Sequence, residues 1–585
     1  MSTETQESPL PLREGDRGRG PASPSRPLSA NEAIKSGSRA LRGTIAEGLT
    51  RAETGALSET DQQLTKFHGI YLQDDRDLRA ERGRKKLEKA FIFMARLRVP
   101  GGVLTPGQWL AAERIARERG NGTLRLTTRQ TIQFHGIIKS NLREAIRGLH
   151  GAMLDTISAC GDVNRNVIAR VNPWQSRAHA EVAGLAQAIG AHLLPKSRAW
   201  HEIWIDSEQI TGGVEEDEPI YGRAYMPRKF KIAIALPPHN DVDVFAHDLG
   251  FIAIEEGRDI VGYNVLAGGG MGMTHGEPDT FPRTGDVIGF CLPEQAVDVA
   301  EKVVTVQRDF GDRSDRKHAR LKCTIERMGL GAFRVELERR LGYALPPARG
   351  FAFTDNGDRL GWVQGDNGAW HCTVFVENGR VRDLPGLHAI AELSIGRFII
   401  TPNQNLVLAD IPPDRRHDVE VLLRTHGLDA PVSGLRRNAL ACVALPTCGL
   451  ALAESERYLP DLIARLEDEL ERVGLAQDEI TIRMTGCPNG CARPYLAEIG
   501  LVGRGPGSYN LYLGGAFDGT RMNKLYRRDV DGDAILTALA PLFRDYAEHR
   551  AAGERFGDFA IRAGHVRPTT SGNRFHADLS PELRS

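Results

Sequence analysis

The chain has 585 residues, of which 41% are hydrophobic and 26% charged, and its formal net charge is −1. That length predicts roughly three or four globular domains, and a net charge near zero gives no overall field that would favour nucleic acid. No apolar run approaches the ~18 residues of a membrane span. Eight cysteines are too few for a disulfide framework in a chain of this length. We therefore expect a cytoplasmic protein with reduced thiols.

The N-terminal part of the sequence is polar. Residues 1–40 are expected to form a disordered tail, and their acidic residues argue against a transit peptide. Residues 41–93 are expected to form an arm. Within it, residues 79–89 (RAERGRKKLEK) predict a solvated helical face or an arm lying on another surface.

Strand and helix patterns alternate from residue 91 onward. The stretch FIFMARLRVPGGV predicts a strand that ends at residues 100–102, and residues 109–119 predict a helix. Residues 124–134 alternate with period two and place arginines on one side. Such a strand either binds an anion or is a solvated edge, and the edge is the usual outcome for this pattern taken alone.

Further along the chain, two stretches could approach anions. Residues 268–272 are rich in glycine but lack the spacing of the dinucleotide fingerprint, so this signal is weak. Residues 311–322 (GDRSDRKHARLK) are a concentrated basic run, which alone indicates a solvated helix face or a nucleic-acid patch. Helices are predicted at residues 296–311 and 460–473, the latter with leucines on one face.

Four cysteines near the C-terminal end form two pairs. Cys442 and Cys448 are separated by five residues, Cys487 and Cys491 by three, and thirty-eight residues lie between the pairs. Four thiolates from two turns can enclose one metal centre, either a structural zinc ion or an iron–sulfur cluster. Zinc sites usually have tighter spacings, and Cys-Pro often accompanies iron–sulfur ligation. The spacing therefore favours the cluster over zinc, with Asn489 on the turn between the second pair.

The two halves of the chain also resemble each other. Residues 126–137 match residues 400–411, with Gln130 opposite Gln404, and 225–235 are paired with 495–503. If the repeat is real, two α/β modules pack about a pseudo-twofold axis, and ligand sites commonly form at such interfaces. One half would then contribute the cysteines and the other Arg165, Lys229 and Lys231.

Beyond these patterns, nearly the whole chain from residue 41 to 568 resembles a known family. The stretches that carry the resemblance are FHGIYLQDDRDLRAER, RVPGG, RLTTRQTIQFHGI, DVNRNV, MPRKFK, DRSDRKHARLK, ACVALPTC and TGCPNGC. They are similar to the siroheme-dependent nitrite and sulfite reductases, and within that superfamily to the hemoprotein (beta) subunit of assimilatory NADPH-dependent sulfite reductase. The resemblance implies an enzyme that reduces sulfite to sulfide with six electrons.

The resemblance also implies cofactors and residue roles. Cys442, Cys448, Cys487 and Cys491 would bind a [4Fe–4S] cluster, and Cys491 would also bind the iron of a siroheme. Sulfite, a dianion, would be bound by four cations and polarised by them; siroheme carboxylates would need further cations. The sulfite-binding residues would be Arg96, Arg165, Lys229 and Lys231; the cofactor-binding residues would be Arg125, Arg129, His135, Arg316, Lys317, Arg320, Lys322 and Asn489.

The implied fold is α+β: two pseudo-symmetric α/β modules and a small repeat-containing domain around a central siroheme–[4Fe–4S] site. We expect the repeat domain at 94–157 with 358–427, the siroheme and substrate module at 158–357, and the cluster module at 428–575. The implied electron donor is a flavoprotein (alpha) subunit carrying FAD and FMN, with ferredoxin as the alternative, since no flavin or NADPH module is recognised. Two other functions remain open: a ferredoxin-dependent nitrite or sulfite reductase, and a zinc-stabilised nucleic-acid-binding scaffold.

Overall fold

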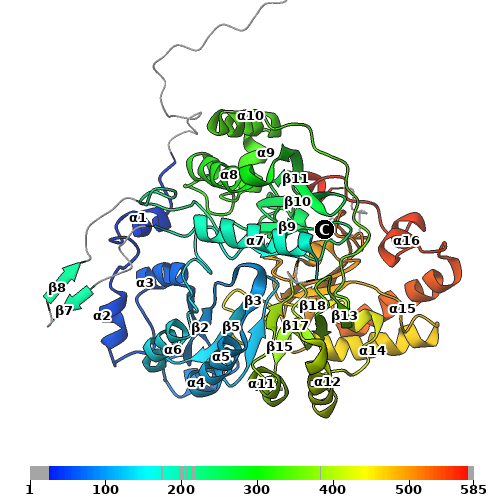
Figure 1. Ribbon diagram of the computed structural model, residues 1–585, viewed down its shortest axis with the longest axis horizontal. Helices are drawn as coiled ribbons and strands as arrows, with labels where there is room; N and C mark the ends of the chain where they lie inside the picture. Colours follow the sequence, from blue (N-terminus) through cyan, green and yellow to red (C-terminus); the bar gives the residue numbers. More distant parts are fainter. Residues whose placement is uncertain are drawn as a thin grey trace, which may run out of the picture.

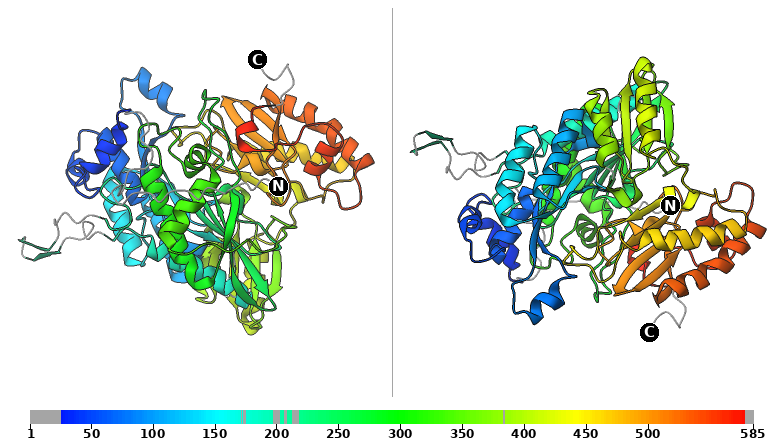
Figure 2. Two further views of the ribbon diagram at one scale, coloured as in Figure 1. Left: turned by 90° about the horizontal axis from the view of Figure 1, so that it is seen from above. Right: turned by 90° about the horizontal axis from the view of Figure 1, so that it is seen from below.

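The computed structural model describes residues 26–577 apart from 171, 173–174, 197–202, 206–207, 212–217 and 383. Within this part, four five-stranded sheets and one two-stranded sheet, β7 (Ile203–Ile205) with β8 (Glu208–Thr211), carry the fold. In the two views of Figure 2, the N-terminal segments and the C-terminal module lie on opposite sides of the molecule. Helices and sheets are both present, which confirms the predicted α+β class.

Two of the sheets form matching modules. In each, three strands are parallel neighbours and two antiparallel strands follow, and the strand orders are the same, β12-β11-β10-β9-β6 and β22-β21-β20-β19-β18. The strands of the first are β6 (Ile168–Ala169), β9 (Ile232–Ala235), β10 (Leu249–Glu256), β11 (Asp259–Ala267) and β12 (Asp286–Cys291). Those of the second are β18 (Ala439–Ala441), β19 (Ile482–Thr485), β20 (Ile499–Gly505), β21 (Ser508–Leu513) and β22 (Lys524–Val530).

Helices cover these two sheets because each has an apolar face that packs on sheet residues. In Figure 1, α8, α9 and α10 lie over the first module, and α14 and α15 lie against the second. The predicted helices at 296–311 and 460–473 are confirmed as α8 and α14. The helices of the first module are α7 (Arg177–His192), α8 (Ala296–Phe310), α9 (Leu321–Met328) and α10 (Leu330–Leu341); those of the second are α13 (Gly434–Arg437), α14 (Leu459–Arg472), α15 (Gly532–His549) and α16 (Phe556–Arg562).

The remaining two sheets form the repeat domain. Their strand orders correspond, and each includes one short strand from the other half of the repeat. One consists of β1 (Ile70–Asp74), β2 (Phe91–Arg96), β5 (Ile132–Ile137), β4 (Leu124–Leu126) and β15 (Arg380–Val381). The other consists of β13 (Gly361–Gln364), β14 (Trp370–Val374), β17 (Leu406–Ile411), β16 (Arg397–Ile400) and β3 (Val103–Leu104). Both share one core with α5 (Pro106–Arg119), α6 (Lys139–Gly151), α11 (Leu384–Glu392) and α12 (Arg416–Thr425).

Reciprocal hydrogen bonds confirm the internal repeat. Gln130 and Gln404 both have left-handed backbones, with φ of 50° and 71°. The Gln130 amide donates to Ile400 O (3.1 Å) and accepts from Ala169 N (2.8 Å). The Gln404 amide donates to Ala441 O (3.1 Å) and Leu126 O (3.5 Å). Each glutamine thus joins the opposite half-sheet to the first strand of a module, as a pseudo-twofold axis requires.

One predicted pairing within the repeat is wrong. Residues 495–503 do not match 225–235, because β20 corresponds to β10 rather than to β9. The same hydrogen bond occurs in both modules: Lys231 N donates to Asp248 (2.9 Å) and Thr481 N donates to Glu498 (2.8 Å). Lys231 therefore corresponds to Thr481 and not to the cysteine loop. The predicted pairing was shifted by one strand because apolar strands that are neighbours in the sequence resemble each other.

Two further expectations need correction. Residues 124–134 form a hairpin rather than one strand, since β4 and β5 pair antiparallel around the turn at Gln130. The tail boundary at residue 40 was placed too far along, because α1 (Ala30–Ser36) buries Glu32 and Lys35. Residues 1–25 of that tail lie outside the described residues.

The arm of residues 41–93 also does not end where expected. Its helices are α2 (Ile45–Thr50), α3 (Glu59–Leu64) and α4 (Arg79–Arg84). The boundary at 93 divides β2, and β1 pairs with β2 throughout, so the arm is part of the repeat domain's sheet. The other domain boundaries stay a prediction.

Candidate functional site

The four cysteines lie at the carboxyl ends of two parallel strands. Cys442 directly follows β18, and Cys487 follows β19, so the two loops leave the same edge of the sheet. The loops are joined by hydrogen bonds from Cys442 N to Met484 O (3.2 Å) and from Gly486 N to Cys442 Sγ (3.3 Å). Burial and the nearby Cys491 raise the pKa of the Cys442 thiol. The sequence-predicted pairs are thus brought into one group.

The sequence spacing of the two cysteine pairs favours a cluster over a single zinc ion. A tetrahedral ion with metal–sulfur bonds of about 2.3 Å needs thiolates within roughly 4 Å of each other. Among the described residues, no three His, Cys, Asp or Glu side chains are arranged to hold one metal ion. Burial, and after it the charge of Cys491, raises the pKa of the Cys448 and Cys487 thiols. A multi-iron cluster would bind the four thiolates and offset their mutual repulsion.

Neighbouring polar groups hold the cysteine loops in place. The Asn489 amide donates to Cys487 Sγ (3.4 Å). Arg76 donates to the carbonyls of Cys448 (3.3 Å) and Ala451 (2.6 Å). Donors aimed at ligand sulfurs and at their loop are the usual means by which a protein orients a metal centre.

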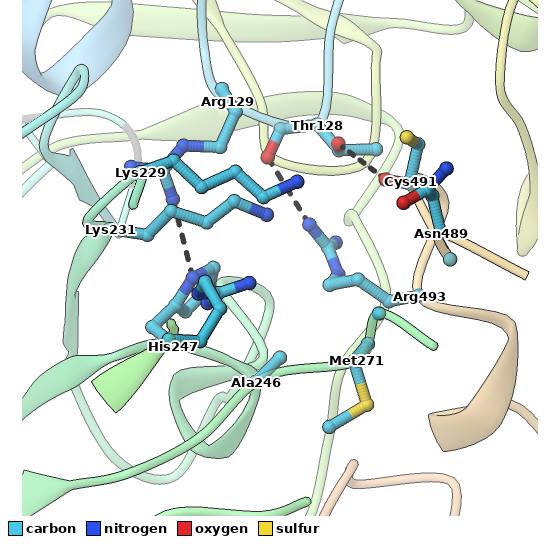
Figure 3. Close-up of a pocket in the computed structure, with 13 residues that line it drawn as sticks. Thr128, Arg129, Lys229, Lys231, Ala246, His247, Met271, Asn489, Cys491 and Arg493 are labelled. Atoms are coloured by element: carbon cyan, nitrogen blue, oxygen red, sulfur yellow. Dashed lines mark hydrogen bonds between the residues drawn. The ribbon is translucent and has the colours of Figure 1, made fainter. Parts of the chain in front are cut away.

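A pocket lies between the two modules beside Cys491. Figure 3 shows Lys229 and Lys231 running side by side from one module, with Cys491, Asn489 and Arg493 on the opposite side. The lining residues are Thr128, Arg129, Lys229, Lys231, Ala246, His247, Met271, Gly272, Arg320, Asn489, Gly490, Cys491 and Arg493. The pocket thus joins the cysteines of one module to the cations of the other.

The two lysines have no counter-charge in this pocket. Within the described chain, no hydrogen bond or ion pair involves either ammonium group, and both side chains are half-buried. Burial, with Arg228 and Arg165 nearby, lowers the pKa of Lys229 to about 7. Burial and Lys229 lower the pKa of Lys231 well below its usual range. Cations crowded in this way favour an anionic ligand, which would restore their charge.

Arg129 and His247 form a pair that also lines the pocket. Burial and the charge of Arg129 lower the pKa of His247 well below its usual value, so the ring is neutral. Its Nε2 donates to Val242 O (2.9 Å), which leaves Nδ1 to accept from Arg129 (3.3 Å). His247 therefore fixes Arg129. His247 was not predicted from the sequence, since a histidine in the loop before β10 belongs to no motif.

Arg493 is a second pocket residue that the sequence analysis missed. The buried carboxylate of Asp243 contacts both Arg493 and Arg483, the latter at 2.6 Å, and Arg493 donates to Thr128 O (3.2 Å). Thr128 in turn donates to Cys491 O (3.2 Å). Arg493 follows the predicted motif TGCPNGC by only two residues, and that proximity was the available signal.

Arg96 and Arg165 lie beside the pocket but do not line it. Arg96 donates to Cys160 Sγ (3.3 Å), and Arg165 donates to Gly161 O (3.3 Å) and to the Tyr71 hydroxyl (3.4 Å). Both are close enough that their charges lower the pKa of Arg129. All four predicted sulfite-binding cations therefore lie close enough to the pocket to affect the pKa values of its lining residues.

The basic run at 311–322 divides between several partners. Arg316 binds Asp162 (2.8 Å), and Lys317 pairs with Glu277 at the surface. Arg320 binds Asp248 with two hydrogen bonds (2.9 and 2.7 Å) and is the one residue of this run in the pocket lining. Lys322 donates to the carbonyls of Gly270, Gly272 and Phe281, so it anchors the glycine loop.

Arg125 and His135 occupy buried positions next to the cysteine module. Arg125 pairs with Glu456 (2.9 Å) and donates to Ala441 O (2.8 Å), so it supports the strand that precedes Cys442. His135 has no hydrogen-bond partner for either ring nitrogen among the described residues, although both are buried. Unpaired buried polar atoms are costly, and this histidine fits contact with a polar cofactor edge.

Comparisons with known proteins give one consistent family. The family described as "Nitrite and sulphite reductase 4Fe-4S domain" matches residues 185–345, and "Nitrite/Sulfite reductase ferredoxin-like half domain" matches 84–152 and 363–425. A Methylobacterium sp. (strain 4-46) protein named "Sulfite reductase [NADPH] hemoprotein beta-component" is 58% identical over 99% of this chain and 97% of its own. A protein of the same name from Anoxybacillus flavithermus is 55% identical over 94% and 98%.

A solved structure agrees with this family. The Mycobacterium tuberculosis NirA protein has a TM-score of 0.74 and 27% identity, covering 92% of this chain and 97% of that one.

Among the described residues, no helix has the length and apolar character needed to cross a membrane.

Proposed function

Because the chain belongs to the nitrite and sulfite reductase family, among the sulfite reductase [NADPH] hemoprotein beta-components, we propose how its residues carry out that family's reaction. It is an oxidoreductase that reduces sulfite to sulfide with six electrons in assimilatory sulfur metabolism. Its cofactors are a siroheme and a [4Fe–4S] cluster. The observation that carries the assignment of the site is the pocket in which Lys229 and Lys231 oppose Cys491.

We assign the cluster to the four grouped cysteines. Cys442, Cys448, Cys487 and Cys491 are the proposed ligands, and Cys491 is the one that lines the pocket, so it is the proposed ligand shared with the siroheme iron. When bound, siroheme and cluster supply the electron transfer. Asn489, Arg125 and Arg76 orient the loops around them.

We assign the siroheme carboxylates to cations around the pocket. Arg129, held by His247, and Arg320, held by Asp248, present guanidinium groups at its wall. His135 is proposed to contact the cofactor edge. Arg316, Lys317 and Lys322 support the assignment indirectly, since their partners are carboxylates or carbonyls of the same module.

Sulfite is assigned to Lys229, Lys231, Arg96 and Arg165. Their combined positive charge binds a dianion and polarises its S–O bonds. Each oxygen that leaves as water requires two protons, and a lysine with a pKa of about 7 can hold and release one near neutral pH. The guanidinium groups remain charged throughout and keep the anion in place.

The relatives' name implies a partner alpha subunit, and we propose that it is a flavoprotein carrying FAD and FMN and that the complex is cytoplasmic. Ferredoxin remains the alternative donor. A nitrite preference is disfavoured by the number of cations, because a monoanion needs less positive charge. The zinc-stabilised scaffold is disfavoured by the sequence spacing of the cysteine pairs, which is wider than zinc sites usually have.

Two variants test the assignment. Cys487→Ser should lose iron, acid-labile sulfide and the visible absorption of siroheme, whereas the isolated Cys323→Ser should keep all three.

Lys229→Ala should keep both cofactors but lower kcat/KM for sulfite roughly tenfold to a hundredfold, the effect of losing one charge-assisted hydrogen bond. Reduced methyl viologen would serve as electron donor, and Lys302→Ala as control. Full cluster content in Cys487→Ser, or unchanged kinetics in Lys229→Ala, would refute the respective role.

A further inference from the structure

A strongly basic surface lies next to the cysteine module and has no role in the proposed reaction. It comprises α4 and the residues that follow, 79–89, with sequence RAERGRKKLEK. Six of these residues are basic and two are acidic. All except Arg82 are exposed. We call residues 79–89 the basic arm.

Much of this charge is not neutralised within the chain. Arg79 pairs with Asp74 (2.5 Å) and Lys85 with Glu81 (2.5 Å). The side chains of Arg84 and Lys86 make no hydrogen bond or ion pair within the described residues. The second acid, Glu88, accepts a hydrogen bond from Gly55 N (3.0 Å). A positive field therefore remains on the solvent side of the arm.

The basic arm is anchored directly to the loop of a proposed cluster ligand. Arg76, three residues before the arm, donates its backbone N–H to Pro446 O (3.2 Å) and its guanidinium to the Cys448 and Ala451 carbonyls (3.3 and 2.6 Å). Asp77 pairs with Arg457 (2.7 Å) just beyond that loop. The arm therefore has a fixed position relative to Cys448.

The protein covering is thin on this side of the cysteines. Cys491 is exposed, but it lines the pocket assigned to siroheme and sulfite. Outside that pocket, Cys442 and Cys448 are partly exposed and Cys487 is buried. Leu450, two residues after Cys448, is 69% exposed, and Leu78 and Leu87 of the arm region are 40% and 52% exposed. Single exposed leucines are ordinary, but apolar side chains beside uncompensated charge are the composition of a protein–protein contact.

We propose that the basic arm and Leu450 form the docking surface for an acidic, flavin-bearing face of the electron-donating partner subunit. Electrons pass between proteins only over short distances, so the donor must approach the cluster at a ligand loop that the protein covers thinly. Because Cys491 faces the pocket assigned to siroheme and sulfite, the approach from outside is the partly exposed Cys448 loop, to which Arg76 fixes the arm. The basic field steers and orients such a partner, and Leu450 packs at the centre of the contact. This inference rests on the proposed function, because it takes the four cysteines to hold the cluster that receives the electrons.

The test reverses charge on the arm in the holoenzyme. R84E/K86E/K89E should lower sulfite reduction driven by NADPH and the partner flavoprotein by about tenfold at low ionic strength, since opposed charges then face each other. Leu450→Asp should lower it as well. The wild-type rate should fall as salt rises, and this dependence should be lost in the triple variant. Sulfite reduction with reduced methyl viologen should remain unchanged in all variants.

The matched control is R258E/R424E/R544E, which makes the same change in net charge at exposed arginines on the β10–β11 turn, α12 and α15. NADPH-driven rates that are equal in the triple variant and this control would overturn the docking surface. A loss of the dye-driven rate in the triple variant would also overturn it, because the arm would then support folding or chemistry. Absence of dye-driven sulfite reduction in the wild type would instead refute the proposed function.

Discussion

At the scale of single residues, the pocket depends on cations that are held without local counter-charges. Asp248 and Asp243 neutralise Arg320 and Arg493, but among the described residues Lys229 and Lys231 have no such partner. Crowding these lysines is unfavourable, and the proposed anionic ligand would offset that cost. Binding and protonation are therefore linked at Lys229.

This linkage predicts how anion affinity changes with pH. The pKa of Lys229 is lowered to about 7, so the ammonium is charged below that pH and loses its proton above it. Siroheme carboxylates, when bound, would move this midpoint upward without changing the direction of the pH dependence. Sulfate, whose own charge is constant between pH 6 and 9, should therefore inhibit sulfite reduction less well as pH rises, by at most about tenfold per pH unit.

The check is the competitive inhibition constant of sulfate, measured with reduced methyl viologen as donor. Lys229→Arg supplies the control, since arginine stays charged over this range, and its inhibition constant should depend less on pH. An inhibition constant that stays flat from pH 6 to 9 in the wild type would show that Lys229 does not titrate with the anion.

At the scale of elements, two glutamines with left-handed backbone conformations, Gln130 and Gln404, connect the half-sheets to the modules. Gln130 and Gln404 each end a turn that begins at a threonine, and their amides reach strands about 40 and 270 residues away. A side chain is needed for these bonds, yet a glycine would suit the backbone better. The need for the side-chain amide at both positions explains why each glutamine keeps a backbone conformation that glycine would adopt more easily.

Two substitutions separate the amide from the backbone. Gln404→Gly removes the buried hydrogen bonds but relieves the positive φ, and should cost about 1–3 kcal/mol. Gln404→Ala loses the same bonds and keeps the strain, so it should be less stable than the glycine variant by about 1 kcal/mol. Thermal unfolding measures both. The exposed Gln364→Ala should differ from wild type by less than about 0.5 kcal/mol, and an alanine variant as stable as the glycine variant would contradict the prediction.

At the scale of the molecule, the repeat domain is one folding unit made from two distant segments. β15 pairs with β4 and β3 pairs with β16, so each half-sheet lacks an edge strand without the other half. The two halves also share a single core. Neither half can bury its apolar face alone.

This arrangement predicts the behaviour of fragments. Residues 41–157 expressed alone should lack a cooperative thermal transition in far-UV circular dichroism, because their apolar face and the edge of β4 would be exposed. Co-expression with residues 346–585 should restore a folded complex. Cooperative unfolding of the isolated fragment would show instead that one half-sheet is stable without its counterpart.

Features that depend on local pattern could be predicted from the sequence. The cysteine spacing favoured a cluster over zinc, the helical patterns located α8 and α14, and the family stretches indicated both cofactors and sulfite. The period-two pattern covered β4 and β5 but predicted one strand instead of a hairpin. These features can be predicted from the sequence because their residues lie within one turn, strand or motif of each other.

Features that depend on contacts between distant residues became known only from the folded structure. Asp243 meets Arg493 across 250 residues, Lys322 anchors a glycine loop, and α1 is buried by partners such as Arg313; no local pattern predicts these pairs. The correspondence of β20 with β10 also required the folded structure, because adjacent apolar strands have similar sequences and only their hydrogen bonds distinguish them. The site forms where a pseudo-twofold axis brings the start of β9 to the end of β19, a juxtaposition that exists only in the folded molecule.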